Sequence, residues 1–242
     1  MTLSVHQFPC LSDNYGFLIR DAATGRVATV DTPDADRILS ELEALGWGRL
    51  DLILNTHWHP DHAGGNAALK AATGCEIVGP DEVTRIAPLD RVVGDGDVVM
   101  LGETALTASA APGHTLGHIL YRSEADGLAF VGDVIFALGC GRLFEGTARQ
   151  MWDSLSLIAG WPGQTVLYCA HEYTAANARF ALSLDPGPGM RAHAEAIFGK
   201  RGRGEPTVPT TVAVETAFNP FLTAGDVETF AARRAAKDAF RG

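Results

Sequence analysis

Four residues of the types that bind metal ions lie within six positions of one short stretch, Thr56 to Gly65. The stretch reads T-H-W-H-P-D-H-A-G-G and contains His57, His59, Asp61 and His62. The preceding segment 51–55 is largely apolar, so we expect a buried strand that ends where the cluster begins. In an extended run alternate side chains point the same way, which lets His57 and His59 face one ion together. Packing alone does not explain so dense a cluster, because buried carboxylates and imidazoles need compensation.

Three further candidate ligands follow other expected strands: His114, Asp133 and His171. Seven ligands are too many for one ion, so we interpret them as two adjacent sites. The first would hold His57, His59 and His114, the second Asp61, His62 and His171, and Asp133 would bridge both. Imidazole suits Zn and Fe, whereas carboxylates leave room for Mn. Two close metal ions can share a water molecule and lower its pKa, and the chemistry that this implies is hydrolysis, with Asp61 and Asp133 in catalytic positions.

Other polar residues near these strand ends are weaker candidates for metal binding. We expect His118 to orient or pack against a ligand rather than to bind metal. Asp31 either caps a turn or holds a ligand imidazole in place. His6 and His193 receive no role, because a lone histidine is more often a surface or core residue.

The apolar periodicity predicts alternating strands and helices up to about residue 172. The expected strands are 3–8, 15–20, 26–31, 51–55, 75–78, 97–100, 104–110, 118–122, 127–132 and 165–169, and the expected helices are 34–46, 65–72 and 148–160. This order indicates an α/β (α+β) fold of mixed sheets covered by helices, with the polar site along one edge of the sheets. After about residue 173 the chain is rich in Ala, Pro, Gly and Arg, and we expect helices at 174–184, 189–199 and 226–238. We therefore place a catalytic domain at 1–172 and a small helical domain at 173–242.

Composition excludes several classes of function. The 242 residues carry a net charge of −10, which argues against broad binding to nucleic acid or to an anionic membrane surface. No run approaches the roughly 18 apolar residues of a membrane span, and the chain does not open with a basic segment followed by an apolar core, so we expect a cytoplasmic protein. We also expect a monomer. The four cysteines form no C-x-x-C pair, which favours buried reduced thiols.

Several motifs resemble one known family. The order T-H-x-H-x-D-H, P-G-H-T-x-G-H, G-D and H-E-Y-T resembles the metallo-β-lactamase superfamily. Within it, the stretches that resemble the glyoxalase II family of hydroxyacylglutathione hydrolases are S-D-N-Y at 12–15, G-C-G-R-L-F-E-G-T at 139–147, E-P-T-V-P at 205–209, N-P-F at 219–221 and R-R-A-A-K-D at 233–238. The resemblance covers nearly the whole chain.

The resemblance implies an αββα sandwich with two divalent metal ions, Zn in the first place with Fe or Mn as alternatives, and a C-terminal helical domain that binds glutathione. A metal-bridging hydroxide would hydrolyse S-D-lactoylglutathione to D-lactate and glutathione in methylglyoxal detoxification. The substrate contacts carried over by position are Arg142, Phe144, Tyr173, Arg234 and Lys237. Of the neighbours Arg233 and Arg234, we favour Arg234 as the substrate contact because of its spacing to Lys237. Cationic groups suit the two carboxylates of glutathione.

Other functions remain open from the sequence. Another superfamily enzyme is the first alternative, such as a β-lactamase, a lactonase or a mononuclear-iron dioxygenase acting on glutathione persulfide. A one-iron site would leave Asp61, His62 and His171 without a purpose, and we expect no signal peptide of the kind that a β-lactamase needs. The second alternative is a thiol- or metal-binding protein without turnover, which the complete set of candidate ligands disfavours.

Overall fold

The computed structural model describes residues 2–184 and 186–242. The described chain forms two compact units. The first contains the residues up to Ala110 together with 117–132, and the second contains 111–116 together with 133–242. The sequence predicted a boundary between residues 172 and 173 that separates a catalytic from a substrate-binding region, whereas these two units are defined by compactness. The functional boundary therefore stays a prediction.

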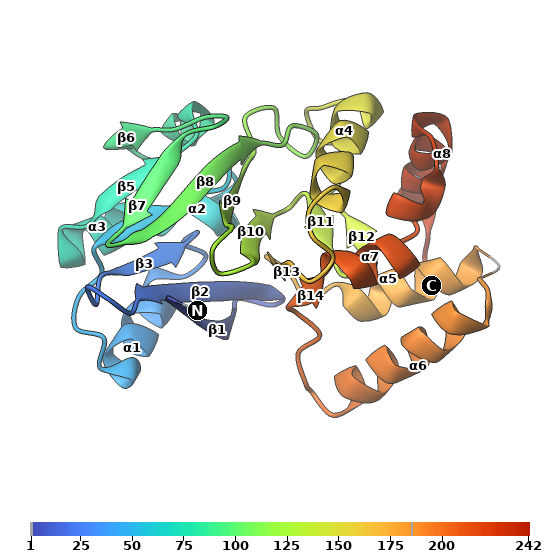
Figure 1. Ribbon diagram of the computed structural model, residues 1–242, viewed down its shortest axis with the longest axis horizontal. Helices are drawn as coiled ribbons and strands as arrows, with labels where there is room; N and C mark the ends of the chain where they lie inside the picture. The colour runs from blue at the N-terminus through green and yellow to red at the C-terminus, as the bar shows by residue number, and fades with distance from the viewer. Residues whose placement is uncertain (1, 185) are drawn as a thin grey trace. The chain divides into compact units, whose positions relative to one another are not determined.

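The first unit opens with a six-stranded sheet in chain order (Figure 1). Its strands are β1 (Leu3–Cys10), β2 (Asn14–Asp21), β3 (Val27–Val30), β4 (Leu52–Leu54), β5 (Glu76–Gly79) and β6 (Arg91–Val92). The first three pair antiparallel and the rest add in parallel. Strands β3 and β4 are buried throughout, which explains their unbroken apolar sequence. The polar residues after them therefore gather at one edge of the sheet.

A second group of strands in this unit pairs antiparallel in the order β10, β9, β8, β7. These strands are β7 (Val98–Leu101), β8 (Thr104–Ala110), β9 (Ile119–Ser123) and β10 (Leu128–Gly132). The two sets of strands face each other across apolar side chains. The rings of Phe17 and Phe130 lie 5.6 Å apart, and the Tyr121 hydroxyl donates to the Asn55 carbonyl oxygen. This unit is a two-layer sandwich with helices on one outer face.

The helices of the first unit cover the six-stranded sheet. They are α1 (Ala35–Leu45), α2 (Pro60–Ala63), α3 (Asn66–Thr73) and the 3-10 turn η1 (Asp81–Arg85). Helix α1 begins at Asp34, whose side chain accepts from the Arg37 amide, and ends at Gly46 with a φ of 62°. Its residues Ile38 and Leu42 pack with Leu69 of α3 onto Leu18 and Ile53 of the sheet. The apolar spacing that predicted this helix is thus the face that it buries.

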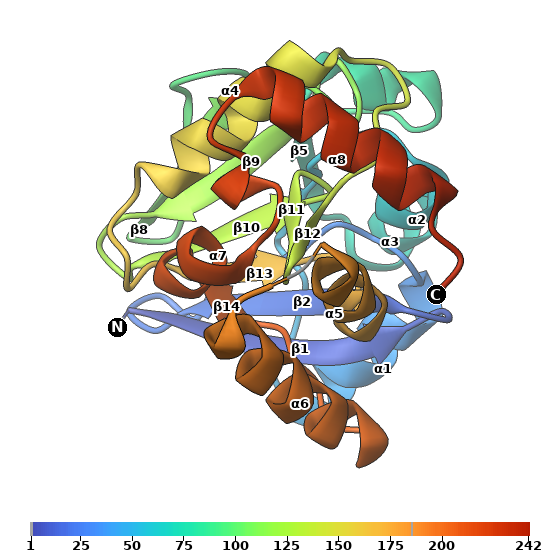
Figure 2. The same cartoon turned by 90° about the vertical axis from the view of Figure 1, so that its right-hand side faces the viewer.

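The second unit is mainly helical (Figure 2). It contains β11 (Ile135–Phe136), β12 (Gly139–Cys140), α4 (Ala148–Ala159), β13 (Val166–Cys169), α5 (Thr174–Ser183), α6 (Pro188–Gly202), β14 (Thr210–Thr211), α7 (Val212–Phe218), η2 (Leu222–Ala224) and α8 (Val227–Ala239). Helix α5 packs beside α6, and α4 beside α8. The aromatic residues Phe180, Phe221 and Phe230 are fully buried among these elements.

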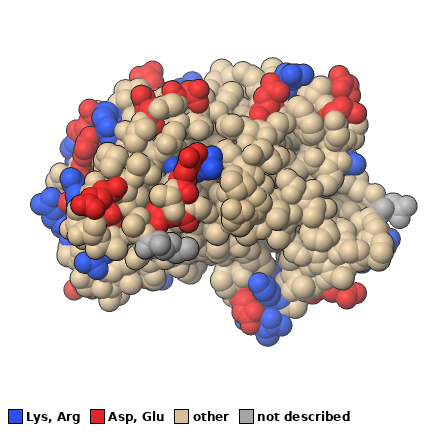
Figure 3. Space-filling view, in the orientation of Figure 1, with Lys and Arg blue, Asp and Glu red and all other residues tan. Residues whose placement is uncertain are grey.

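The predicted elements agree closely with those of the structure. Every expected strand and helix is present, with ends that shift by a few residues. The sequence analysis missed short elements: α2, η1, β6, the β11–β12 hairpin, β14, α7 and η2. The four cysteines are buried and free of disulfides, as expected. Acidic and basic side chains are interspersed on the face that Figure 3 shows.

Candidate metal centre and adjoining cavity

The loop after β4 brings the four clustered residues of the first unit together. His57 Nε2 lies 3.0 Å from His59 Nδ1, and the rings of His57 and His62 are 4.0 Å apart. His59 precedes α2, where Pro60 opens the helix and turns Asp61 and His62 back toward the sheet. The side chain of Asp61 reaches within 3.5 Å of His62 Nε2. The cluster predicted from sequence is therefore one spatial group of nitrogen and oxygen donors.

Hydrogen bonds to the outer ring nitrogens fix the tautomers of two of these histidines. The Thr56 hydroxyl donates to Asp31 Oδ2 and so can only accept from His57 Nδ1, 3.0 Å away. His62 Nδ1 lies 2.7 Å from the same carboxylate. Both imidazoles then carry their proton on Nδ1, which leaves the Nε2 lone pair for a cation. An imidazole held this way by a carboxylate is the usual arrangement around a bound metal ion.

Asp31 is thus an orienting residue, one of the two roles that the sequence left open. It also accepts a hydrogen bond from the Thr56 amide at 2.8 Å, and its φ of 58° lies in the left-handed region. Asn14 is a contact that the sequence analysis did not assign. Its amide donates to Asp61 Oδ2 at 3.0 Å, and its place in the S-D-N-Y motif was the available signal. His118 stacks on His57 at 4.8 Å, as a packing residue would.

The second unit brings together the other three candidates. His114 Nε2 lies 3.3 Å from Asp133 Oδ2, and His171 Nε2 lies 3.3 Å from Asp133 Oδ1. The Asp133 carboxylate therefore lies between two imidazoles, and all three side chains are buried. His114 Nδ1 donates to the Arg142 carbonyl oxygen at 2.9 Å, so its Nε2 is also the unprotonated nitrogen. Gly141 passes so close to Asp133 and His114 that a side chain there would clash.

The donor set of each unit fits divalent metal ions. Buried imidazoles with bare Nε2 atoms and adjacent carboxylates are ligands for Zn, Fe or Mn. In the first unit His57 and His62 present donor atoms within 4.8 Å of each other, and so do Asp61 and His62. His57 Nε2 also faces a ring nitrogen of His59 at 3.0 Å, so both rings direct a nitrogen into the same region.

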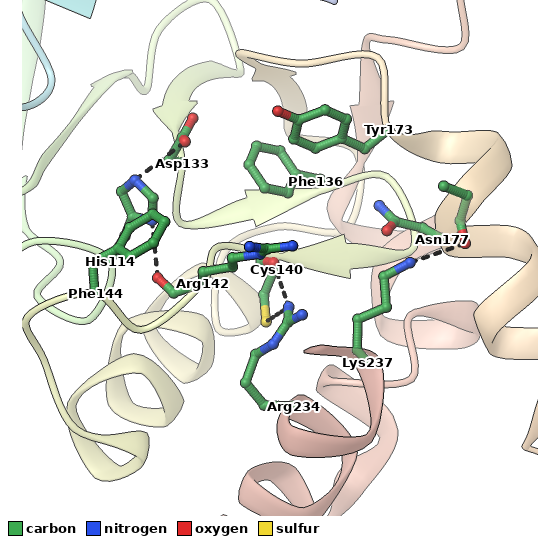
Figure 4. Close-up of a pocket in the computed structure, with 11 residues that line it drawn as sticks. His114, Asp133, Phe136, Cys140, Arg142, Phe144, Tyr173, Asn177, Arg234 and Lys237 are labelled. Carbon is green, nitrogen blue, oxygen red and sulfur yellow. Dashed lines mark hydrogen bonds and ion pairs between the residues drawn. The ribbon is translucent and has the colours of Figure 1, made fainter. Parts of the chain in front are cut away.

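A cavity of about 400 Å³ opens beside His114 and Asp133 in the second unit (Figure 4). Phe136 forms one wall, and its ring packs edge-on against both His171 and Tyr173. Tyr173 in turn stacks on His171 with the rings 2° from parallel and 4.7 Å apart. Aromatic surface thus adjoins the candidate ligands on this side.

Three cations line the same cavity: Arg142, Arg234 and Lys237. Arg142 extends into it with 66% of its side chain exposed. Arg234 is only 6% exposed, and it donates to the Cys140 carbonyl oxygen at 2.8 Å and to Asp238 at 2.9 Å. Arg233 instead contacts Pro220 and Thr223. Of the two neighbouring arginines, the one that faces this cavity is therefore Arg234.

Lys237 lies at the far side of the cavity from His114 in Figure 4. Its ammonium group donates to the Ala176 carbonyl oxygen at 3.0 Å and lies 5.4 Å from the Phe180 ring centroid. Burial, helped by the positive charges of Arg234, Arg179 and Arg142, lowers the pKa of Lys237 to about 8. The lysine is therefore charged at neutral pH but close to its titration range.

The remaining predicted contacts also border this cavity. Phe144 is 62% exposed, and its ring lies 5.2 Å from that of His114. The sequence analysis missed Phe136, Cys140 and Asn177, which line the cavity as well. The G-C-G motif contains Cys140, but nothing in the sequence marked Phe136, because its strand is two residues long.

Two family models divide the chain between them. Residues 28–171 match the model of the metallo-beta-lactamase superfamily, so the fold and the ligand pattern define the chain as a member of that superfamily. Residues 172–240 match the model of the hydroxyacylglutathione hydrolase C-terminus. The chain belongs to the hydroxyacylglutathione hydrolase family, as its motifs indicated.

Curated relatives agree over the full length. The chain is 53% identical to the hydroxyacylglutathione hydrolase of Erythrobacter litoralis, with 98% of this chain and 100% of the relative covered. It is 55% identical to that of Maricaulis maris, with 93% and 88% covered.

Solved structures confirm the fold class. A crystal structure of ETHE1 from Myxococcus xanthus superimposes with a TM-score of 0.73 at 25% identity, covering 96% of this chain and 90% of that one. A metallo-beta-lactamase from Staphylococcus aureus gives a TM-score of 0.72 at 19% identity, covering 99% and 67%. Within the described residues, no helix is both long and apolar enough to cross a membrane.

Proposed function

We propose that this chain hydrolyses S-D-lactoylglutathione and related 2-hydroxyacylglutathione thioesters to the hydroxy acid and glutathione, as part of methylglyoxal detoxification. The observation that carries the proposal is that three cations line the same cavity as His114 and Asp133. Glutathione has two carboxylates, and an acidic protein must gather local positive charge to bind it. A neutral lactone gives no reason for such a cluster.

The side chains around the cavity would divide the work of binding. Arg142 and Lys237 offer charged groups to the carboxylates of the glutathione part, while Arg234 holds the cavity wall and adds positive potential. Tyr173 and Phe144 flank the candidate ligands on either side of the cavity and would confine the thioester carbonyl near Asp133. A residue for protonating the leaving group is unnecessary, because a thiol ionises near pH ~8.5 and departs as thiolate.

We further infer that the chain holds two divalent metal ions, with Zn as the first choice. Their ligands would be His57, His59, Asp61, His62, His114, Asp133 and His171. When bound, the ions would supply a water of lowered pKa and polarise the thioester carbonyl.

The region 173–242 would act as the substrate-binding part. The meeting of the two family models between residues 171 and 172 supports this division. We also infer a monomer that works in the cytoplasm. Buried free thiols fit a reducing compartment. Sedimentation of the purified protein and fractionation of cells test these two points.

The decisive experiment assays one purified sample on three substrates and measures its metal content. S-D-lactoylglutathione should be hydrolysed, with loss of the thioester absorbance, while a β-lactam and glutathione persulfide should turn over at least 100-fold more slowly. Elemental analysis should give close to two metal ions per chain. Turnover of the persulfide by a one-iron sample, or full thioesterase activity after complete metal removal, would refute the proposal.

A further inference from the structure

The β11–β12 hairpin is linked to each of the three candidate ligands in the second unit, by contact or by short connecting segments of the chain. Its first strand begins two residues after Asp133. Its second strand leads to Arg142, whose carbonyl oxygen accepts from His114 Nδ1 at 2.9 Å. Its residue Phe136 packs edge-on against His171 with the rings 5.7 Å apart. A shift of this hairpin would therefore disturb all three side chains.

The hairpin is too small to hold itself in place. Each strand has two residues, joined by Ala137 and Leu138. Leu138 adopts a φ of 57°, a left-handed conformation that costs free energy in a residue other than glycine. A pair this short has little stability of its own, so contacts from elsewhere must fix it.

Helix α7 supplies several of those contacts. The Glu215 carboxylate accepts from the Leu138 amide at 2.8 Å, and its other oxygen accepts from the Thr210 hydroxyl at 2.6 Å. Asn219, at the end of the same helix, donates to the Gly139 carbonyl oxygen at 2.9 Å and to Glu215 at 2.9 Å. The amide nitrogen of Asn219 carries two hydrogens, and we assign them to these two shorter bonds. The Phe136 carbonyl oxygen, at 3.3 Å from the same nitrogen, is then a weaker contact.

Both side chains are completely enclosed. Glu215 is 1% exposed and Asn219 is 0% exposed. Neither reaches the cavity that contains His114 and Asp133, so neither can touch a substrate there. A buried carboxylate is costly to keep unless it is hydrogen-bonded, and its partners here are the Leu138 amide of the turn, the Thr210 hydroxyl and the Asn219 side chain.

We propose that Glu215 and Asn219 are positioning residues, which fix the β11–β12 hairpin and through it the arrangement of His114, Asp133 and His171. The pair acts through the backbone rather than on the substrate. The inference rests on the proposed metal centre where metal retention is measured. The mobility of the hairpin can be followed without metal or substrate.

The test compares Glu215→Ala and Asn219→Ala with the parent protein. Amide hydrogen exchange at residues 138–140 should become at least 10-fold faster in both variants. The chelator concentration that removes half of the bound metal should fall at least 10-fold, the size of effect that loss of an outer-shell contact typically has. Thermal unfolding should remain cooperative.

Two further variants make the test specific. Glu215→Gln can keep every hydrogen bond, because its carbonyl accepts where Leu138 and Asn219 donate and the Thr210 hydroxyl can rotate to accept, so it should stay within twofold of the parent. The matched control is Thr216→Ala on the same helix, whose hydroxyl bonds only to Val212 and Ala213 of that helix. It should change neither measurement.

Several outcomes would overturn the proposal. Folded alanine variants with both measurements within twofold of the parent would do so, and so would faster exchange with unchanged metal retention. A loss in Glu215→Gln as large as in Glu215→Ala would also count against it. If the alanine variants do not fold, amide exchange and metal retention are measured on Asn219→Ser instead, and the same thresholds apply. A parent that binds metal but leaves S-D-lactoylglutathione intact refutes the proposed function alone.

Discussion

The Oδ2 atom of Asp31 lies 2.7 Å from Nδ1 of His62, and Asp31 holds this position with a backbone φ of 58°. The same carboxylate receives the Thr56 hydroxyl, which in turn accepts from His57. One buried acid therefore sets the tautomers of two candidate ligands. The strained backbone of Asp31 is consistent with a conformation retained for this purpose.

Asp31→Asn should weaken metal binding by about 10- to 100-fold, because its single oxygen cannot accept from the Thr56 amide as well as from the Thr56 hydroxyl and His62, as the two carboxylate oxygens do. Competition with a chromophoric chelator measures the effect. Asp34→Asn is the control, since Asp34 only caps α1 through the Arg37 amide. Equal metal affinity in Asp31→Asn and the parent would show that the orienting role is wrong.

Arg142 and Arg234 should respond differently to replacement by alanine. Arg142 is exposed, so its loss should raise KM for the thioester by about 10-fold with little change in stability. Arg234 is buried against Cys140, Asp238 and the Phe221 ring, so its loss should also destabilise the protein by about 2–4 kcal/mol. Urea unfolding and steady-state kinetics on both variants separate these effects. Similar stabilities would contradict the structural role of Arg234.

The loss of charge on Lys237 should raise KM for the thioester in mildly alkaline solution. Because burial and the neighbouring arginines lower its pKa to about 8, the lysine is charged below that pH and loses its charge as pH rises through it. Glutathione carboxylates stay ionised throughout, so the attraction weakens between pH 7 and 9. Lys237→Arg should give a flat KM profile, and Lys200→Met, an exposed control, should keep the parent profile. A parent KM that is constant over this range would exclude the effect.

The candidate ligands could be picked out from the sequence because they follow the ends of apolar strands. The strands before His57 and His171 are short apolar runs with clear limits, so the polar residues after them were conspicuous. The tautomers and the place of Asp31 could not be predicted, since they depend on hydrogen bonds between residues 25 to 31 positions apart.

The β11–β12 hairpin and α7 escaped prediction for a different reason. The turn at Leu138 uses a left-handed residue where sequence rules expect Gly or Asn. Helix α7 is seven residues long and begins with β-branched residues, so its periodicity is too brief to recognise. Glu215 and Asn219 join these elements, and such a tertiary contact leaves no local pattern in the chain.

Glu215 should make the stability of the protein fall as pH rises. Its burial raises its pKa to about 7 despite the hydrogen bonds from Thr210, Leu138 and Asn219. Because the folded pKa exceeds the unfolded value of 4.5, its stabilising contribution is complete below pH 4.5 and is lost as pH rises through about 7. The loss amounts to about 3 kcal/mol when complete.

Glu215→Gln removes this titration while keeping the hydrogen bonds. The free energy of unfolding of the variant relative to the parent should therefore increase between pH 4.5 and 8, by up to about 3 kcal/mol. Urea unfolding at several pH values measures the difference, and groups common to both proteins cancel in it. A difference that stays constant with pH would mean that Glu215 ionises in the folded protein as readily as in the unfolded chain, which its enclosure by α7 and the hairpin makes unfavourable.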